Sequence, residues 1–84
     1  MLAITFTREA AKALKRMPAN VAATIRAKIE HYATDPDSLA NNVKTLKGSN
    51  GLRRLRIGDW RVIFTENGEV LAILKIAPRG EAYE

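Results

Sequence analysis

The sequence contains no cysteine, one histidine and one tryptophan among its 84 residues. The lack of cysteine excludes disulfides, cysteine-based zinc sites and thiol catalysis. No apolar run approaches the ~18 residues needed to span a bilayer, and the N-terminus lacks the pattern of a signal peptide. These absences predict a cytoplasmic protein with no metal site, no cofactor and no membrane contact.

The remaining composition is that of a small globular protein. Hydrophobic residues make up 46% of the chain and charged residues 27%, which is typical of a folded rather than a disordered chain. A chain of this length buries only about 60% of the surface that its unfolded form exposes. We therefore expect residues 1–84 to form a single domain around one core.

Positive charge is concentrated in one stretch of the sequence. Lysine and arginine total 14 and aspartate and glutamate 9, a net charge of +5. Residues 44–61 hold one acid, Asp59, and six basic residues: Lys44, Lys47, Arg53, Arg54, Arg56 and Arg61. The rest of the chain is neutral. Such a patch is typical either of a surface for an anionic partner or of a solvated charged face.

The N-terminal half reads as a short strand followed by two helices. Residues 2–6 are β-prone, and apolar residues at helical spacing predict a helix over 8–17 that ends at Pro18. Asn20 can cap a second helix, which has its own apolar stripe. Residues 34–43 are rich in Asp, Pro, Ser and Asn and predict a loop or irregular turn. The two helices would form an αα-hairpin.

From Val43 onward the apolar pattern has a period of two. It predicts three strands: 52–57, 60–66 and 69–76. The pairs Gly58-Asp59 and Asn67-Gly68 between them suit two-residue hairpin turns. The order β-α-α-β-β-β predicts an α+β fold, in which an N-terminal strand and an αα-hairpin precede an antiparallel sheet with the helices on one face.

Two-residue turns fix which residues oppose one another. Arg56 then opposes Arg61, and Lys75 opposes Trp60. One face, the core face, holds seven apolar residues: Leu55, Ile57, Trp60, Val62, Phe64, Leu71 and Ile73. The other face holds Arg54, Arg56 and Arg61, with Ile63, Ala72 and Leu74. Directly opposed like charges destabilise a strand pair by up to ~1 kcal/mol, and guanidinium groups are well suited to phosphate. The register therefore favours anion binding over a solvated face.

At residues 52–64, the run LRRLRIGDWRVIF resembles the signature of the RelE/ParE toxin superfamily of type II toxin–antitoxin systems, and the RelE-like branch is favoured. Three further segments resemble parts of the same family: EAAKALKRMP, VKTLKG (43–48) and APRGEAYE (77–84). The resemblance covers nearly the whole chain. It implies a RelE-like, microbial RNase-like fold.

The resemblance also implies an activity, the cleavage of mRNA in the ribosomal A site. Arg61 matches the strand arginine that stabilises the attacked phosphate, and Arg54 assists the charge balance. Arg79 and Tyr83 match an arginine and a tyrosine that follow the last strand. We expect these four residues to be catalytic, and we expect RNA to be bound by Lys44, Lys47, Arg53 and Arg56.

RNA cleavage by 2′-hydroxyl attack needs a base, an acid and positive charge on the phosphorane, and the charge is usually the largest contribution. The arginines could supply the charge. His31 is expected at the end of the second helix, away from the arginines. Tyr83 is the best remaining candidate for proton transfer, although a free tyrosine has a pKa near 10. Alternatively, the ribosome orients the RNA so that modest side chains suffice.

The expected partners follow from the same resemblance. They are a cognate antitoxin, whose acidic or amphipathic arm would be steered by the charge of the chain, and mRNA on the ribosome. The alternative is a ParE-like inhibitor of DNA gyrase without nuclease activity. A third possibility is an inactive or purely partner-binding homologue.

Overall fold

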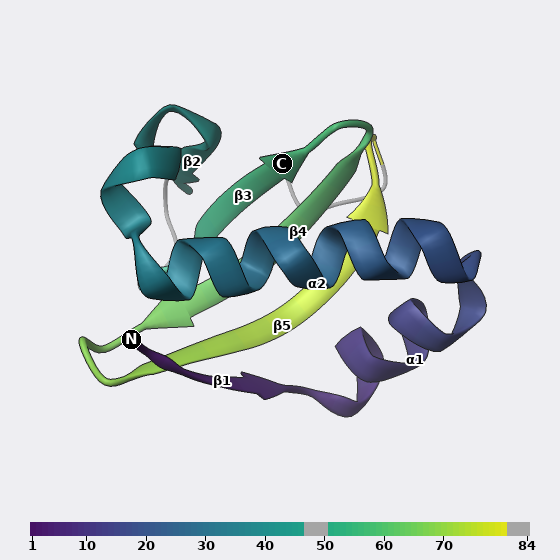
Figure 1. Ribbon diagram of the computed structural model, residues 1–84, viewed down its shortest axis with the longest axis horizontal. Helices are drawn as coiled ribbons and strands as arrows, with labels where there is room; N and C mark the ends of the chain where they lie inside the picture. Colours follow the sequence, from purple (N-terminus) through teal and green to yellow (C-terminus); the bar gives the residue numbers. More distant parts are fainter. Residues whose placement is uncertain (47–50, 81–84) are drawn as a thin grey trace.

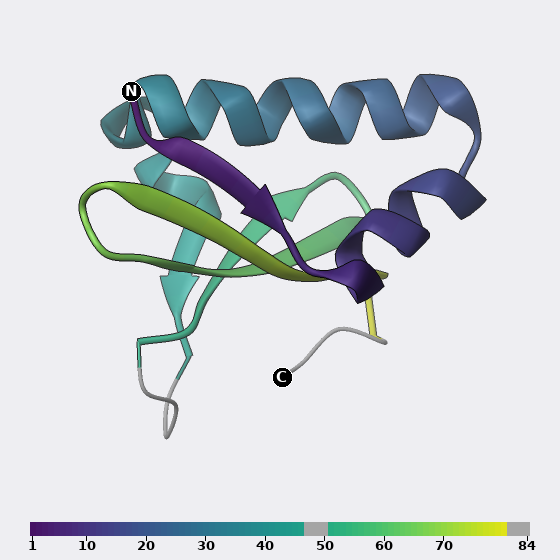
Figure 2. The ribbon, with the colours of Figure 1, turned by 90° about the horizontal axis from the view of Figure 1, so that it is seen from below.

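The structure is a computed structural model that describes residues 1–46 and 51–80. In chain order the elements are β1 (Ala3–Phe6), α1 (Arg8–Arg16), α2 (Ala19–Thr34), the 3-10 helix η1 (Pro36–Asn42), β2 (Val43–Thr45), β3 (Arg53–Ile57), β4 (Trp60–Glu66) and β5 (Val70–Pro78). The helices lie on one side of the sheet (Figures 1 and 2). None of the helices in these ranges has the length and apolar character needed to cross a bilayer.

The two long helices form the expected αα-hairpin. The side chain of Thr7 accepts a hydrogen bond from the Ala10 amide and caps α1, as is common for threonine at this position. The predicted cap at Asn20 is wrong. Helix α2 begins at Ala19, and the carbonyl of Pro18 accepts from the amides of Val21 and Ala22. Pro18 is therefore the N-cap of α2, and its ring fixes the backbone angle φ at this position.

The five strands form one sheet in the order β1-β5-β4-β3-β2. Strand β1 pairs with β5 in parallel, whereas the other neighbours are antiparallel. The sheet is therefore mixed rather than wholly antiparallel. The three-residue edge strand β2 was not predicted. It pairs with β3 and extends the sheet, and it lies in a segment that was expected only to precede the first sheet strand. So short a strand gives almost no periodic signal of its own.

The predicted register of the first hairpin is confirmed. Ile57 opposes Trp60, Leu55 opposes Val62 and Arg56 opposes Arg61. Gly58 has φ 57°, whereas no residue other than glycine has a positive φ in residues 1–46 and 51–80. Positive φ at only the first of the two turn residues is the pattern of a type II′ turn.

The predicted register of the second hairpin is wrong. Glu66 pairs with Leu71, so four residues rather than two form the loop. The side chain of Asn67 accepts hydrogen bonds from the amides of Glu69 and Val70. This side-chain turn replaces the two-residue backbone turn that the Asn-Gly pair usually forms.

A bulge then shifts the register of β5 by one more residue. Phe64 opposes Ile73, but the next residue, Ile63, opposes Lys75, so Leu74 has no partner across the pair. The Leu74 carbonyl accepts a hydrogen bond from the Thr7 hydroxyl at 2.8 Å. Because a shift of one residue exchanges the two faces of a strand, the bulge moves Lys75 to the face away from the helices.

The helices and the sheet form two layers (Figure 2), and the hydrophobic core contains buried residues from both. Its largest fully buried side chains are Phe64, Ile25, Ile29, Leu71, Ile73 and Val62. Trp60 is partly buried and packs against this core, as its position on the core face predicts. The opposite face of the sheet is therefore left for the charged side chains.

Candidate nucleic-acid interface

Basic side chains gather on the sheet face away from the helices. Strand β3 contributes Arg54 and Arg56, and β4 contributes Arg61 opposite Arg56. Lys44 on the edge strand β2 lies directly opposite Arg54. We call these four residues the basic face. Sequence reasoning had placed the three arginines together, and the pairing of β2 with β3 adds the lysine to them.

The basic face contains two directly opposed pairs of like charge. Lys44 faces Arg54, and Arg56 faces Arg61. Each such pair weakens strand pairing by a few tenths of a kcal/mol up to ~1 kcal/mol. The arrangement thus lowers stability, and an anion bound between the strands would offset that cost.

The Arg61 guanidinium is folded back onto its own turn. Its Nη1 donates to the carbonyls of Gly58 at 2.9 Å and Trp60 at 3.0 Å. One nitrogen is thereby anchored, and the other donors of the planar fork can contact a phosphate. The turn therefore restricts the motion of this side chain.

Arg79 lies beside the same turn, just after β5. Its amide donates to the carbonyl of Asp59 at 2.6 Å, so the backbone of Arg79 is held next to the β3–β4 connection. The side chain of Arg61 and the backbone of Arg79, two of the predicted catalytic arginines, thus both contact the β3–β4 turn.

A pocket of about 200 Å³ lies at the edge of the sheet and reaches the basic face. It is lined by Asn41, Asn42, Val43, Lys44, Arg54 and Arg56. The Asn42 amide also donates to the Arg56 carbonyl at 3.4 Å. Three cations and two amides around one small pocket are suited to an anion with polar substituents.

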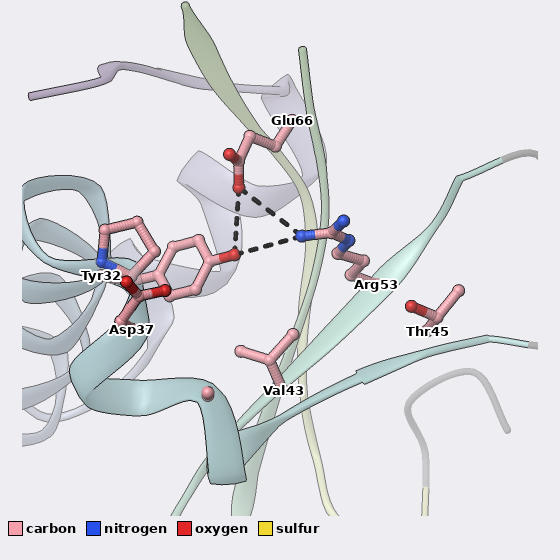
Figure 3. Close-up of a pocket in the computed structure, with 8 residues that line it drawn as sticks. Tyr32, Asp37, Val43, Thr45, Arg53 and Glu66 are labelled. Atoms are coloured by element: carbon pink, nitrogen blue, oxygen red, sulfur yellow. Dashed lines mark hydrogen bonds and ion pairs between the residues drawn. The ribbon is translucent and has the colours of Figure 1, made fainter. Parts of the chain in front are cut away.

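Arg53 lies on the other face of β3 from Arg54. Its Nη1 donates to the Tyr32 hydroxyl at 3.4 Å and lies 3.8 Å from Oε1 of Glu66, while Tyr32 donates to the same Oε1 at 3.0 Å (Figure 3). These contacts border a pocket of about 410 Å³ between η1 and the sheet, near Asp37. Burial and the hydrogen bond to Glu66 raise the pKa of the Tyr32 hydroxyl. Strand alternation therefore separates Arg53 from the basic face, although the sequence groups them.

Two predicted site residues, Lys47 and Tyr83, lie outside the described residues. The sequence prediction missed one residue of the basic surface, Lys75. It was expected opposite Trp60 but lies opposite Ile63, which in turn lies opposite Arg54. The spacing of the β5 core residues Leu71, Ile73 and Ile76 changes from two to three at the bulge, but Leu74 between them is also apolar, so the sequence alone does not show the change.

Groups for proton transfer are scarce on this surface. Within residues 1–46 and 51–80, no strand position on the basic side of the sheet holds a histidine or a carboxylate. Asp59 lies nearby, in the turn between β3 and β4. His31 is exposed in the last turn of α2, as expected, where its Nε2 lies 2.8 Å from the Ser38 hydroxyl. The described part of the chain also has no group of three or more His, Asp or Glu residues that could hold a metal ion.

A second surface, on the helix side, is apolar. Two shallow pockets of about 360 and 330 Å³ are both lined by Trp60. Val21 and Ile25 line the first pocket together with the charged residues Lys28 and Asp59. Met17 and Ile76 line the second together with Arg16. We call this surface the Trp60 groove.

Comparisons with known proteins agree with this architecture. The archaeal RelE–RelB complex from Pyrococcus horikoshii OT3 contains a chain 29% identical to this one, with a TM-score of 0.78 over 96% of this chain and 98% of that chain. The Escherichia coli RelBE toxin–antitoxin complex matches at 15% identity and a TM-score of 0.75, covering 98% of this chain and 100% of that chain. The E. coli DinJ–YafQ complex matches at 14% identity and a TM-score of 0.73, covering 99% of this chain and 98% of that chain. The last two show a shared fold only.

No curated protein shows significant sequence similarity to the chain. The family model described as the ParE toxin of type II toxin-antitoxin system, parDE, matches residues 4–83. This match covers nearly all of the sequence, and the sheet order and helix placement of the structure agree with it. The chain therefore belongs to the ParE toxin family, within the RelE/ParE superfamily of type II toxin–antitoxin toxins.

Proposed function

We propose that this type II toxin inhibits translation as a ribosome-dependent mRNA endonuclease, and that the basic face binds the RNA. The supporting observation is the gathering of Lys44, Arg54, Arg56 and Arg61 from three neighbouring strands on one face. Cations spaced across adjacent strands suit a chain of phosphates better than a single small anion. The proposal also requires the protein to reside in the cytoplasm, where mRNA is translated.

The proposed chemistry is attack of the RNA 2′-hydroxyl oxygen on the neighbouring phosphorus, which breaks the bond from phosphorus to the 5′-oxygen of the next nucleotide and leaves a 2′,3′-cyclic phosphate. The 2′-hydroxyl gives up its proton, and the departing 5′-oxygen takes one up. Negative charge then grows on the phosphorane oxygens, where a positioned guanidinium is most effective. Arg61 is anchored by the Gly58 and Trp60 carbonyls, so it can meet this charge with little reorganisation. Arg54 and Arg79 would complete the positive surroundings of the phosphate.

Proton transfer is assigned to Tyr83, which the family resemblance matches to a tyrosine after the last strand. The ordinary pKa of a tyrosine is about 10, so this role requires cations of the complex to lower the pKa toward the working pH. The ribosome would hold the RNA in a conformation suited to attack, which can supply much of the rate enhancement. Dependence on the ribosome follows from the scarcity of acid–base groups on the basic face.

RNA binding is assigned to Lys44, Lys47 and Arg56 together with the catalytic arginines. Lys44 and Arg56 border the pocket at the sheet edge, where a phosphate would meet several cations at once. Arg53 is assigned a structural role instead, because it is engaged with Tyr32 and Glu66 on the helix side.

The second candidate function is inhibition of DNA gyrase without RNA cleavage. The observation that favours it is the lack of histidine and carboxylate on the described strand positions of the basic face, and the matching family model is that of ParE. A purely binding surface needs positive charge but no proton-transfer group.

A pair of assays distinguishes these functions. Cleavage of mRNA in a translation extract, mapped at codon resolution, should occur with the wild-type protein and fall about 100-fold or more in Arg61→Ala. Lys12→Ala, which removes one exposed charge from α1, is the matched control. Intact message together with inhibited supercoiling by gyrase would refute the nuclease and support the second candidate.

An antitoxin is the proposed regulatory partner, since the similar structures include toxin–antitoxin complexes. The Trp60 groove is lined by apolar residues, by the cations Lys28 and Arg16 and by one acid, Asp59, so it suits an amphipathic arm that carries acidic residues. Electrostatic steering predicts that association slows as salt rises. Association rates measured by surface plasmon resonance at 50 mM and 500 mM salt would test this, and equal rates would contradict it.

A further inference from the structure

We propose that Lys75 is an additional phosphate-binding residue, which the bulge at Leu74 brings to the basic face, and that the path of the bound polyanion crosses all four strands from β2 to β5. This inference rests on the proposed RNA-binding function. It adds a residue and a direction to that function, neither of which the sequence pattern indicated.

The sheet register carries the argument. Lys44 opposes Arg54, Arg54 opposes Ile63, and Ile63 opposes Lys75. Directly opposed residues point to the same side of a sheet. These four residues therefore form one row across β2, β3, β4 and β5, on the side away from the helices. Three of the four are cations.

The bulge is what puts Lys75 in this row. Without the extra residue, Lys75 would share a face with Leu71 and Ile73, which are both 1% exposed in the core. Bulges often re-aim a side chain beside a functional site. Here the Thr7 hydroxyl holds the carbonyl of the bulged Leu74, so the distortion is tied to the start of α1.

The dimensions of the row suit an extended polyanion. Strands lie about 4.8 Å apart, so three spacings separate the backbones of Lys44 and Lys75 by about 14 Å. That length accommodates more than one phosphate. A second row, with Arg56 and Arg61, runs beside the first toward the turn, so the polyanion would have cations along one flank.

The floor between these cations is apolar. Ile63 is 4% exposed and Ala77 is 6% exposed, and both lie outside the main core cluster, on the basic side of the sheet. Low polarity beneath the cations strengthens their attraction for phosphate. Lys75 itself is partly buried, which is typical of a lysine whose aliphatic stem covers apolar surface while its ammonium group reaches water.

The test is binding of a fluorescein-labelled single-stranded RNA oligonucleotide, measured by anisotropy between 25 and 300 mM salt. Lys75→Ala should weaken binding about fivefold at low salt and reduce the slope of log affinity against log salt by about 0.7. Lys75→Arg should restore both, and Lys75→Glu should weaken binding further. Lys12→Ala controls for general loss of charge, and thermal unfolding checks that each variant is folded.

Arg56→Ala separates this inference from the function on which it rests. If Arg56→Ala weakens binding while Lys75→Ala behaves like Lys12→Ala, the basic face binds RNA but Lys75 takes no part, and the inference is overturned. If neither variant differs from Lys12→Ala, the proposed RNA-binding surface is itself wrong. Loss in both variants, with recovery in Lys75→Arg, supports both proposals.

Discussion

Arg53 and Arg54 are adjacent in the sequence and have identical side chains, but the sheet gives them opposite surroundings. Arg53 faces the helices, where it contacts the Tyr32 hydroxyl and the Glu66 carboxylate. Arg54 faces away from them, between Lys44 and Ile63.

Under the proposed function, the same residue type would serve structure on one face and binding on the other. On the helix side, cation, phenol and carboxylate satisfy one another beside the core. On the basic face, cations of neighbouring strands lie directly opposite one another, which lowers stability and suits an anionic ligand. Substitutions on the basic face should therefore change activity more than stability, and substitutions among the contacts of Arg53 should change stability more than activity.

The largest expected effect is on activity. Arg54→Ala should lower the rate of mRNA cleavage about 10- to 100-fold, because it removes charge-assisted contacts to phosphate worth about 1.5–3 kcal/mol. Arg53→Ala should change that rate less than twofold, because its side chain faces the other way. Rates from cleavage in a translation extract provide the measurement. Equal losses in the two variants would break the distinction between the faces.

The next effect is on stability. Tyr32 is 3% exposed, and its hydroxyl donates to Glu66. Tyr32→Phe should lower the free energy of unfolding by about 1–2 kcal/mol, since it leaves a partly buried carboxylate without this donor. Cleavage should be unaffected in the folded protein. Urea denaturation measures the change, and wild-type stability in Tyr32→Phe would show that the network contributes nothing.

A smaller effect of opposite sign is expected on the basic face. Arg56→Thr removes the like-charge pair with Arg61 and inserts a residue that favours strands, so stability should rise by about 0.2–1 kcal/mol. The gain should shrink as salt screens the repulsion. Urea denaturation at 20 mM and 500 mM salt tests both points. A loss of stability at low salt would indicate that Arg56 makes a favourable contact.

The smallest effect appears only at alkaline pH. The folded state raises the pKa of Tyr32 above its ordinary value of 10.0, so folding favours the neutral phenol. This contribution is complete below pH 10 and is lost as the pH rises through the higher pKa of the folded state. The wild type should therefore lose stability more steeply than Tyr32→Phe above pH 10. Urea denaturation of both proteins from pH 9 to 12 measures this difference. An equal loss of stability in the wild type and in Tyr32→Phe would contradict a raised pKa for Tyr32.

The sequence was most informative where local signals agreed. The Gly58-Asp59 pair fixed a two-residue turn, and the alternating pattern of β3 and β4 allowed one register that kept Leu55 and Val62 in the core. The pairing of Arg56 with Arg61 followed, and the structure confirms it. The Asn67-Gly68 pair was misleading, because the Asn67 side chain caps a longer loop.

The misplacement of Lys75 and the grouping of Arg53 with the other cations have different origins. The first arose because a bulge adds a residue to one strand only, which a strict two-residue period does not represent. The second arose because a run of charge was counted without regard to the face on which each residue lies. Alternation along β3 already separates Arg53 from Arg54, but its partners Tyr32 and Glu66 come from distant parts of the chain.

By itself, the sequence determined the helical hairpin, the first β-hairpin and the arginines that share its outer face, because turns and periodicity act over a few residues. Only the tertiary structure decided the parallel pairing of β1 with β5, the addition of β2, and the contacts of Arg53. The β1–β5 pairing and the contact of Arg53 with Tyr32 join segments far apart in the chain, whose pairing is selected by burial of a common core. Strand β2 pairs with the next strand in the chain but is too short to give a periodic signal. The bulge at Leu74 belongs to this second group, since the Thr7 hydroxyl that holds its carbonyl is 67 residues away.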